Sequence, residues 1–240
     1  MVRRPARARP ETPPPPPPTG TERERIIAAF MALLAEKRFE AIDFGEVAAR
    51  ADVSLAELRD EFGSTLAIFA AHVKAIDRAV LAGGEGDMTE EPPRERLFDV
   101  LMRRIELLAP HKEAIRSLLR SARRDPPLAL ALNAITVRSQ QWMLTAADIH
   151  ASGPRGLVRA QGLALLWSRV LRTFVRDEDE GHARTMAALD RELGRGARWI
   201  GFIDDLCRFV PGCRPRRRHR RDWTRSPTTS GPSRLSALQP

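Results

Sequence analysis

The chain contains no tyrosine and only two cysteines among its 240 residues, and aromatic residues make up 5% of it. The cysteines, Cys207 and Cys213, have a spacing that fits no common zinc site, and we expect free thiols in a reducing compartment. The five histidines are scattered, and no serine or cysteine has the sequence context of a catalytic nucleophile. We therefore expect no metal site, no cofactor and no enzymatic activity.

Long apolar runs are also missing from the sequence. No stretch approaches about 18 consecutive apolar residues, the minimum for a membrane-spanning helix. The first residues include several arginines but no apolar segment behind them, so they do not match a signal peptide. We expect a cytoplasmic protein with no membrane partner.

The whole chain has a net charge of +9, and its positive charge is concentrated at the two ends. Residues 1–20 contain eight prolines, four arginines and one glutamate, and residues 207–240 contain nine arginines and one aspartate. The residues between them therefore carry a net charge of −2. We expect a disordered Pro/Arg-rich arm over 1–20 and a disordered Arg-rich tail over 207–240. The tail is either a solvated extension, or it attracts DNA or acidic lipid nonspecifically.

Helical periodicity runs through nearly all of the sequence between these ends, and no convincing alternating strand is found. Apolar residues recur at spacings of three and four, and the strong helix formers Ala, Leu, Arg and Glu predominate. Proline and glycine mark the breaks. The pattern predicts an all-α fold with helices over 22–37, after Asp43, and over 54–62, 64–82, 94–109, 111–123, 127–147, 155–176 and 180–206.

Two short helices joined by a tight turn follow the first long helix, which is the arrangement of a helix-turn-helix domain. An acceptor side chain with glutamate three residues later marks each of the three helix starts: Thr21 with Glu24, Asp43 with Glu46, and Ser54 with Glu57. We therefore expect a three-helix helix-turn-helix domain over residues 21–70 and a larger helical body over 71–206.

The segment from Arg25 to Ile68 resembles the N-terminal domain of TetR-type (TetR/AcrR) transcriptional regulators. The resemblance rests on Ile26-Ile27-Ala28-Ala29-Phe30, Phe39-Glu40-Ala41-Ile42, Val47 through Ser54, Leu58, Phe62 and Ile68. It implies a ligand-responsive transcriptional regulator that acts as a homodimer, with the helix Leu55–Phe62 in the major groove of double-stranded DNA. It also implies that the body binds an apolar small-molecule effector and forms the dimer interface.

Three positions depart from the family pattern. Asp52 stands where the family usually has a turn glycine, Arg59 where it has tyrosine, and Thr65 where it has lysine. Aspartate tolerates the left-handed conformation better than most residues, so the turn can form. The DNA-binding residues that the resemblance implies are Ser54, Leu55, Ala56, Arg59 and Thr65, with Leu55 and Ala56 suited to thymine methyl groups.

The charge of the expected DNA-binding domain favours a different function. Residues 21–70 hold ten acidic and six basic residues, a net charge of −4. DNA affinity rests largely on neutralising phosphates, so an acidic domain starts at a disadvantage, unless the arginines of the N-terminal arm enter the minor groove. The alternative is a TetR-fold accessory protein that binds an apolar ligand or lipid. It resembles the TetR-like protein of ubiquinone biosynthesis, and its helix-turn-helix has no DNA role.

Large apolar side chains in the body are candidates for a ligand pocket, namely Trp142, Met143, Trp167, Leu171 and Phe174. Such residues suit an adaptable apolar pocket, and they suit an ordinary core equally well. For dimerisation the sequence offers two apolar stripes, one of Leu163, Leu166, Val170 and Phe174 and the other of Met186, Leu189 and Leu193. Burial within the chain explains such stripes equally well, and the family resemblance favours the dimer. We expect the acidic run 177–180 to cap the following helix and not to bind metal.

Overall fold

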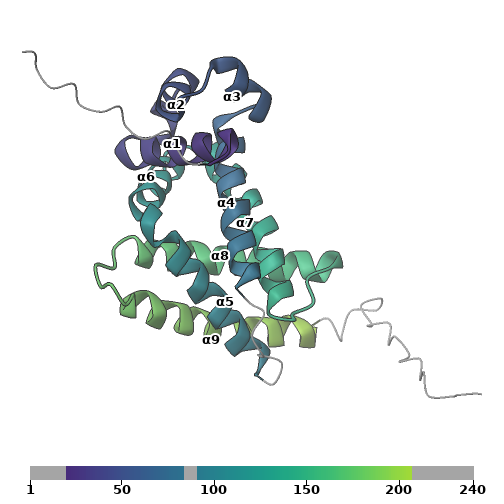
Figure 1. Ribbon diagram of the computed structural model, residues 1–240. Coiled ribbons are helices and arrows are strands. Elements are labelled where there is room, and N and C mark those ends of the chain that lie inside the picture. The colour runs from purple at the N-terminus through teal and green to yellow at the C-terminus, as the bar shows by residue number, and fades with distance from the viewer. Residues whose placement is uncertain (1–19, 84–90, 207–240) are drawn as a thin grey trace, which may run out of the picture. The chain divides into compact units, whose positions relative to one another are not determined.

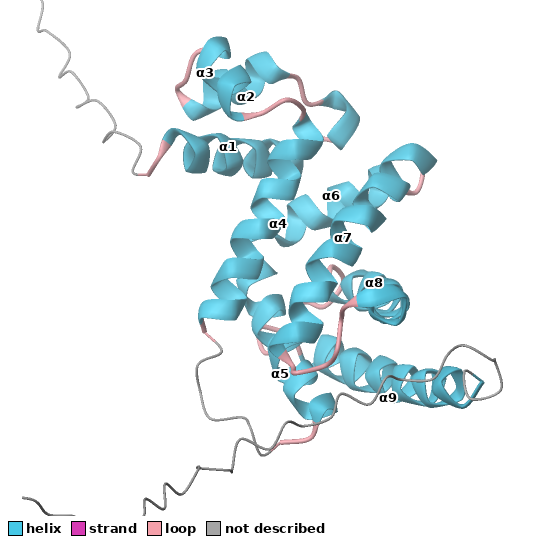
Figure 2. Ribbon diagram, turned by 90° about the vertical axis from the view of Figure 1, so that its right-hand side faces the viewer, coloured by secondary structure: helices cyan, strands magenta, loops and turns pink. Residues whose placement is uncertain are grey.

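The computed structural model describes residues 20–83 and 91–206, with side chains up to residue 196, and these residues form helices and no strand. The α-helices are α1 (Glu22–Glu36), α2 (Phe44–Ala51), α3 (Leu55–Glu61), α4 (Thr65–Ala82), α5 (Pro93–Leu108), α6 (Lys112–Ala122), α7 (Pro126–Ala146), α8 (Gly153–Phe174) and α9 (Ala183–Leu206). Short 3-10 helices, η1 (Phe39–Ala41) and η2 (Ala109–His111), precede α2 and α6 (Figures 1 and 2). The all-α fold class is confirmed for these residues. The arm over 1–19 and the tail over 207–240, with both cysteines, lie outside them.

The first three helices begin where the sequence predicts, because each start has its own capping box. At α1, the hydroxyl of Thr21 accepts a hydrogen bond from the backbone N–H of Glu24 at 3.3 Å, and the Thr21 N–H donates to the Glu24 carboxylate at 3.0 Å. Equivalent boxes start α2 and α3. Each box satisfies backbone N–H groups that a helix start leaves unpaired, and a cap of this kind stabilises a helix by about 1 kcal/mol.

The head, which we define as α1 to α3 with the first half of α4, has a hydrophobic core of its own. Its most deeply buried side chains are Ile26, Phe30, Leu34, Val47, Leu58 and Ile68. In Figure 1, α1 lies below α2 and α3, which pack against it. α6 closes the core from the side of the body with Ala114 and Leu118.

The body, which comprises the second half of α4 and the helices after it, has a second core. α4 joins the two, because Ile68 lies in the head core whereas Ile76 and Val80 lie in the body core (Figure 1). The boundary expected at residue 70 therefore falls inside a continuous helix. α5, α7, α8 and the start of α9 supply most of the remaining body core.

α6 also fixes the end of α1 through two buried serines. The Ser117 hydroxyl donates to the carbonyl of Lys37 at 2.7 Å, and the backbone N–H of Phe39 donates to the Ser121 hydroxyl at 3.2 Å. Backbone groups at a helix end have no partner within the helix, so these hydroxyls replace the missing ones. The head and the body are thus connected through both α4 and α6.

The acidic run before α9 has the capping role that the sequence predicts. Asp177 is 1% exposed, and its carboxylate accepts hydrogen bonds from the backbone N–H and the hydroxyl of Thr185 at 2.8 and 2.7 Å. Asp179 accepts a further one from the Ala183 N–H at 2.9 Å. In the part of the chain that the structure describes, no group of three or more His, Cys, Asp and Glu side chains is placed to hold a metal ion.

Candidate DNA-binding and ligand-binding sites

The turn between α2 and α3 is made by Asp52 in the left-handed conformation, with φ 52° and ψ 54°. Its backbone N–H donates to the carbonyl of Ala48, and its own carbonyl accepts a hydrogen bond from Arg25 Nη1 at 3.2 Å. Aspartate is among the few non-glycine residues that adopt this conformation at low cost. The prediction that Asp52 can replace the turn glycine is confirmed, and Arg25 of α1 holds the turn against the head.

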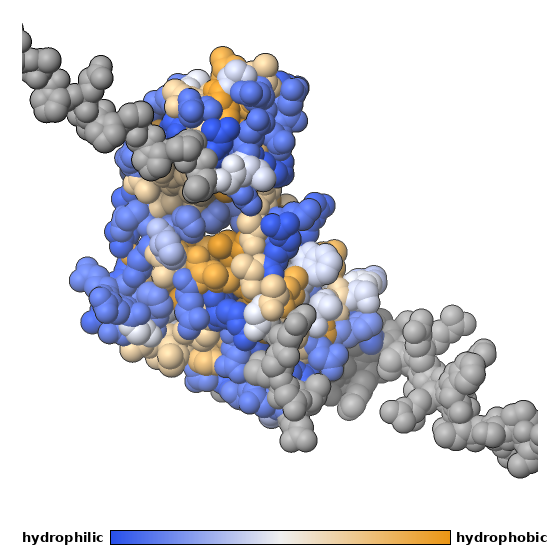
Figure 3. Space-filling model, viewed as in Figure 1, coloured by the Kyte–Doolittle hydropathy of each residue, from blue (hydrophilic) through white to orange (hydrophobic). Residues whose placement is uncertain are grey.

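α3 turns its expected contact residues outward. Leu58 is 2% exposed and anchors the helix on the head core, whereas Leu55 is 59% exposed. Ala56 and Arg59 are exposed as well. Figure 3 shows apolar surface at the tip of the head, over α2 and α3. The local fold therefore offers a short helix whose outer face is available to a partner.

The two expected hydroxyl contacts lie at helix starts. Ser54 is the exposed N-cap of α3, and its hydroxyl accepts a hydrogen bond from the Glu57 N–H at 3.2 Å. Thr65 is the half-buried first residue of α4. A helix N-terminus has unpaired N–H groups and a positive dipole end, which favour an anion beside Thr65.

Two of the three acidic side chains around α3 are engaged within the head. The Glu57 carboxylate accepts a hydrogen bond from the Ser54 N–H at 2.6 Å, and this bond lowers the pKa of Glu57. Glu61 forms an ion pair with Arg23 of α1 at 2.7 Å. Asp60 and Arg59 make no hydrogen bond or ion pair within the described residues. Pairing with Arg23 therefore removes the charge of Glu61, whereas Glu57 keeps its charge as part of the helix cap.

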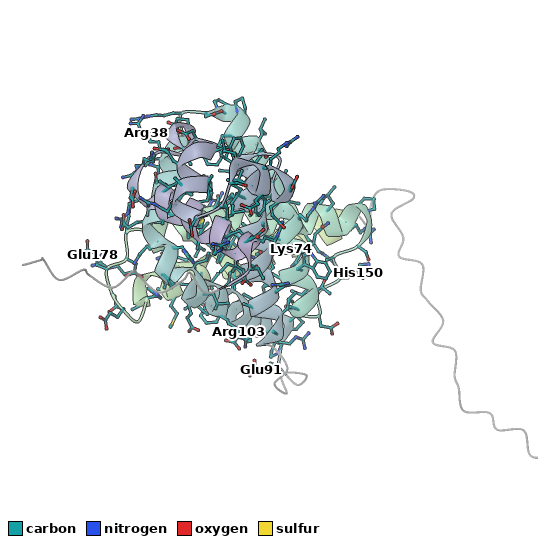
Figure 4. The ribbon with its side chains drawn as sticks, turned by 45° about the horizontal axis from the view of Figure 1, so that its top comes forward. Arg38, Lys74, Glu91, Arg103, His150 and Glu178 are labelled. Atoms are coloured by element: carbon teal, nitrogen blue, oxygen red, sulfur yellow. The ribbon has the colours of Figure 1, made fainter. Side chains whose placement is uncertain are left out.

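The structure separates the expected ligand-pocket residues into two groups. Met143, Trp167 and Phe174 are at most 3% exposed and pack in the body core, and Leu171 packs against that core. Trp142 is 56% exposed. It lines a different feature, a surface hollow of about 760 Å³ at the end of α7, together with Ile149 and His150. Figure 4 shows His150 at the edge of the body. Grouping Trp142 with the other four was wrong, because consecutive residues of a helix point in different directions.

The body core also contains a cluster of buried polar side chains that the sequence analysis missed. Arg104 of α5 is 4% exposed, and its Nη1 lies 2.9 Å from Asp77 Oδ1 of α4. The Ser139 hydroxyl of α7 donates to Asp77 at 2.8 Å and accepts from Arg104 at 2.5 Å. The Arg104 guanidinium carbon lies 5.3 Å from the ring centroid of Trp167 of α8. Four helices of the body thus meet at one ion pair.

Several buried polar side-chain atoms have no hydrogen-bond partner within the described residues. They include both side-chain polar atoms of Gln140, which is fully buried, and Nε2 of His72. His72 packs edge-on against His111, with ring centroids 4.6 Å apart. A buried polar atom without a partner costs about 1–3 kcal/mol. A polar group that made these hydrogen bonds would remove that cost.

The burial of His72 leads to a prediction about stability at acid pH. Burial, then the neighbouring His111 and Arg104, lower the pKa of His72 to about 4, from an ordinary value of 6.5. Between these two pH values the unfolded chain binds a proton that the folded chain does not, so stability falls as the pH falls. The loss approaches about 3 kcal/mol at pH 4.

Urea unfolding of the wild type and of His72→Gln between pH 7 and pH 4.5 measures this loss. We expect the free energy of unfolding of the variant to fall less steeply with acidification. His150→Gln is the matched control, because His150 is exposed, and it should retain the wild-type slope. If the free energy of unfolding of His72→Gln fell with pH as steeply as that of the wild type, the His72 ring would take up its proton in the folded state as readily as in the unfolded state.

The sequence contains one signal for the polar cluster. Arg104 falls on the apolar stripe of α5, at spacings of three and four from Leu101 and Leu108. A charged residue on a buried stripe needs a partner of opposite charge, and Asp77 lies on the apolar stripe of α4, three residues before Val80. The pairing itself depends on the packing of α4 against α5.

The apolar stripes expected to form the dimer interface face the core of their own chain, except that Met186 is 43% exposed. Leu163, Leu166, Val170, Phe174, Leu189 and Leu193 are each at most 7% exposed. For these six residues the structure shows burial within the chain, the alternative that periodicity alone cannot distinguish from burial between chains. A different face of α8 is open, on which Val158 and Leu165 are 54% and 51% exposed and Gly162 lies between them with open space around it.

None of the described helices is both long enough and apolar enough to cross a lipid bilayer. No protein-family model and no curated protein matches the chain. Solved structures do match it. A TetR transcriptional regulator from Nitrosomonas europaea ATCC 19718 aligns with a TM-score of 0.59 over 75% of this chain and 99% of that one, at 23% identity. A TetR transcriptional regulator from Rhodococcus sp. RHA1 aligns with a TM-score of 0.54 over 73% of this chain and 95% of that one, at 24% identity.

These likenesses agree with the elements described above. The first three helices form a helix-turn-helix head, α4 leads from it into an all-helical body, and the alignments cover nearly the full length of both solved chains. The chain therefore has the fold of the TetR-type transcriptional regulators.

Proposed function

We propose that the protein is a transcriptional regulator that binds double-stranded DNA through α3. The observation that carries this proposal is the outer face of α3, where Leu55, Ala56 and Arg59 are exposed. Two acidic side chains of the same segment, Glu57 and Glu61, are engaged within the head. Because Arg23 pairs with Glu61, a DNA phosphate approaching α3 meets one unpaired negative charge fewer than the sequence suggests.

Each expected contact residue has a role in this proposal. Arg59 donates to a guanine edge or a phosphate, and Leu55 and Ala56 contact thymine methyl groups. The hydroxyls of Ser54 and Thr65 donate to phosphates, and at Thr65 the start of α4 adds its backbone N–H groups. Together these contacts would place α3 in the major groove.

We further propose that the body binds an effector where its apolar core meets the polar cluster. Met143, Trp167, Leu171 and Phe174 supply apolar surface, while Gln140 and Arg104 have polar atoms without partners. This combination fits a mainly apolar molecule that bears a hydrogen-bonding group. α4 has one end in each core, so an effector that prefers one position of α4 would also change the position of the head.

The alternative, an accessory protein that binds an apolar ligand and no DNA, is favoured by one observation. Asp60 lies on the outer face of α3, two residues from Leu58, and makes no ion pair within the described residues. An exposed carboxylate repels phosphates. In the regulator proposal Asp60 instead accepts a hydrogen bond from a cytosine amino group, which turns the same charge into specificity.

The two functions are separated by selection of random duplex DNA with the full-length protein. The salt concentration should be about 150 mM, so that weak ionic contacts are screened. Enrichment of a palindromic site supports the regulator and its proposed homodimer, because a two-fold protein reads two half-sites. Failure to enrich any site supports the alternative, and the next step would be to identify the apolar molecule that copurifies with the protein.

The variant Arg59→Ala should bind the selected site more weakly by about 1–3 kcal/mol, which is roughly 5- to 150-fold in Kd. Its folding should be unchanged, because the Arg59 side chain is exposed. Fluorescence anisotropy with a labelled duplex measures the Kd. Arg78→Ala, which removes an exposed arginine from α4, is the matched control and should leave the Kd unchanged. Equal affinities for the two variants would remove Arg59 from the DNA contact.

A further inference from the structure

A concentration of positive charge lies where the end of α1 meets the end of α6, and α3 contributes no residue to it. The feature is a hollow of about 390 Å³ lined by Glu36, Lys37, Arg38, Ser117, Arg120, Arg123 and Arg124. All but two of these residues are cationic, and one is an acid. Figure 4 shows Arg38 at the outer edge of the head. The hollow is thus lined from two sides, by the head and by α6.

The acid of the lining, Glu36, is neutralised by a residue outside the hollow. Both of its carboxylate oxygens accept hydrogen bonds from Arg50 of α2, at 2.6 and 2.9 Å. This contact lowers the pKa of Glu36. A bidentate pair of this kind holds the carboxylate in place, so Glu36 repels an incoming anion only weakly.

The cations of the lining differ in how far they are already engaged. Lys37 forms an ion pair with Glu46, and Arg38 lies 3.9 Å from Glu40. Three others make no side-chain hydrogen bond within the described residues: Arg120, Arg123 and Arg124. Each of these guanidinium groups has five N–H donors available.

The surrounding acids do not cancel this charge. Hydrogen bonds from its own backbone and from Ser121, and then the charges of Arg38 and Arg124, lower the pKa of Glu40. With Glu40, Glu46 and the Arg50 partner of Glu36 included, the region still holds twice as many cations as acids. Like charges this close repel one another, and a bound anion would relieve that repulsion.

The helix ends at this place explain the surplus only in part. Cations near a helix C-terminus are stabilised by the helix dipole. Arginines that served this purpose alone would donate to the terminal carbonyls, and the three free ones donate to none within the described residues. The carbonyl of Lys37 and the N–H of Phe39 are instead satisfied by Ser117 and Ser121.

We infer that this hollow binds a small phosphate-bearing anion, which bridges the head to the body. Lys37 and Arg38 hold the anion from the head, and the arginines at the end of α6 hold it from the body. The planar fork of a guanidinium matches the geometry of phosphate oxygens and binds them bidentately. The inference does not depend on whether α3 binds DNA.

The test uses the full-length protein and sodium pyrophosphate, compared with sodium chloride at the same ionic strength. The test variant is Arg120→Gln/Arg123→Gln/Arg124→Gln. The matched control, Arg216→Gln/Arg217→Gln/Arg218→Gln, removes the same charge from the Arg-rich tail. Thermal unfolding and hydrogen exchange are measured for each protein, with and without pyrophosphate.

We expect pyrophosphate to raise the Tm of the wild type and of the tail variant by about 5 °C at a hundredfold excess over Kd. It should also slow hydrogen exchange in both 36–41 and 120–125. In the hollow variant we expect a Kd at least tenfold higher and no protection in either segment. Equal binding by the hollow and tail variants, protection of one segment only, or no Tm rise in the wild type would each overturn the inference.

Further measurements with other probes identify the source of the phosphate. Adenosine diphosphate and vesicles of phosphatidylcholine with phosphatidic acid present the same group on a nucleotide and on a lipid. Any of these probes that protects both segments in the wild type and not in the hollow variant supports the inference. Protection by duplex DNA alone would overturn it, because the hollow would then be part of a DNA-binding surface.

Discussion

The variant Asp77→Asn should be less stable than the wild type by about 3–5 kcal/mol, which lowers the Tm by roughly 10 °C in a chain of this size. The substitution keeps the shape of the side chain and removes the charge opposite Arg104, which is 4% exposed. A guanidinium cannot lose its proton at accessible pH, so the charge stays buried without a partner. Urea unfolding followed by circular dichroism measures the loss.

Two controls test whether burial of the ion pair causes this effect. Asp190→Asn breaks the exposed ion pair with Arg94 and should cost about 1 kcal/mol or less. Arg104→Met should cost less than Asp77→Asn, because burial already raises the pKa of Asp77 and this carboxylate can take up a proton. The double variant Asp77→Leu/Arg104→Met should recover most of the lost stability, since it leaves no buried charge.

These outcomes also bear on the proposed effector site, because the ion pair lies in its wall. If Asp77→Asn costs no more than Asp190→Asn, the two charges are not desolvated and the polar cluster is open to water. The proposal of a mainly apolar effector with one polar group would then lose its basis. If the double variant recovers its stability but no longer responds to the effector, the ion pair takes part in binding the effector.

The variant Leu165→Glu should raise the dissociation constant of the proposed homodimer at least about hundredfold, which leaves a monomer at micromolar concentration. Leu165, Gly162 and Val158 lie on one exposed face of α8, and Gly162 allows a second helix to approach closely. A charge at the centre of such an interface must be buried without a partner. Sedimentation velocity of the full-length protein measures the mass.

Leu130→Glu is the matched control for this prediction, because Leu130 of α7 is 72% exposed and lies outside the α8 face. It should sediment as the wild type does. A monomeric wild type, or an unchanged mass for Leu165→Glu, would exclude this face as the dimer interface. If the protein reads a palindromic DNA site, Leu165→Glu should also lose most of its affinity for that site, since one head reads only half of it.

The helices and their starts could be predicted from the sequence because their causes are local. The hydroxyl of Thr21 and the carboxylate of Glu24 are three residues apart, and that spacing alone brings them to the same backbone N–H groups. Asp52 is similar, since the left-handed conformation is a preference of the residue itself. The exposed position of Arg59 follows in turn from the burial of Leu58 in the same short helix.

Charge could be counted from the sequence but not located. The net charge of −4 over residues 21–70 is correct as a sum. Arg23 and Glu61 are far apart in the chain, and only the packing of α1 against α3 pairs them. The surplus of cations around Arg38 and Arg120 is a further case, because α1 and α6 meet only in the folded chain.

The sequence by itself determined the all-α fold, the caps, the turn and the short helix proposed to read DNA, all of which follow from interactions within a few residues. The tertiary structure alone decided which apolar face of α8 is covered and which is open. It placed Trp142 at the surface and brought Asp77, Arg104 and Ser139 together in the body core. The physical reason is that a periodic stripe records only that a face is buried, while its partner depends on contacts between helices that are distant in the chain.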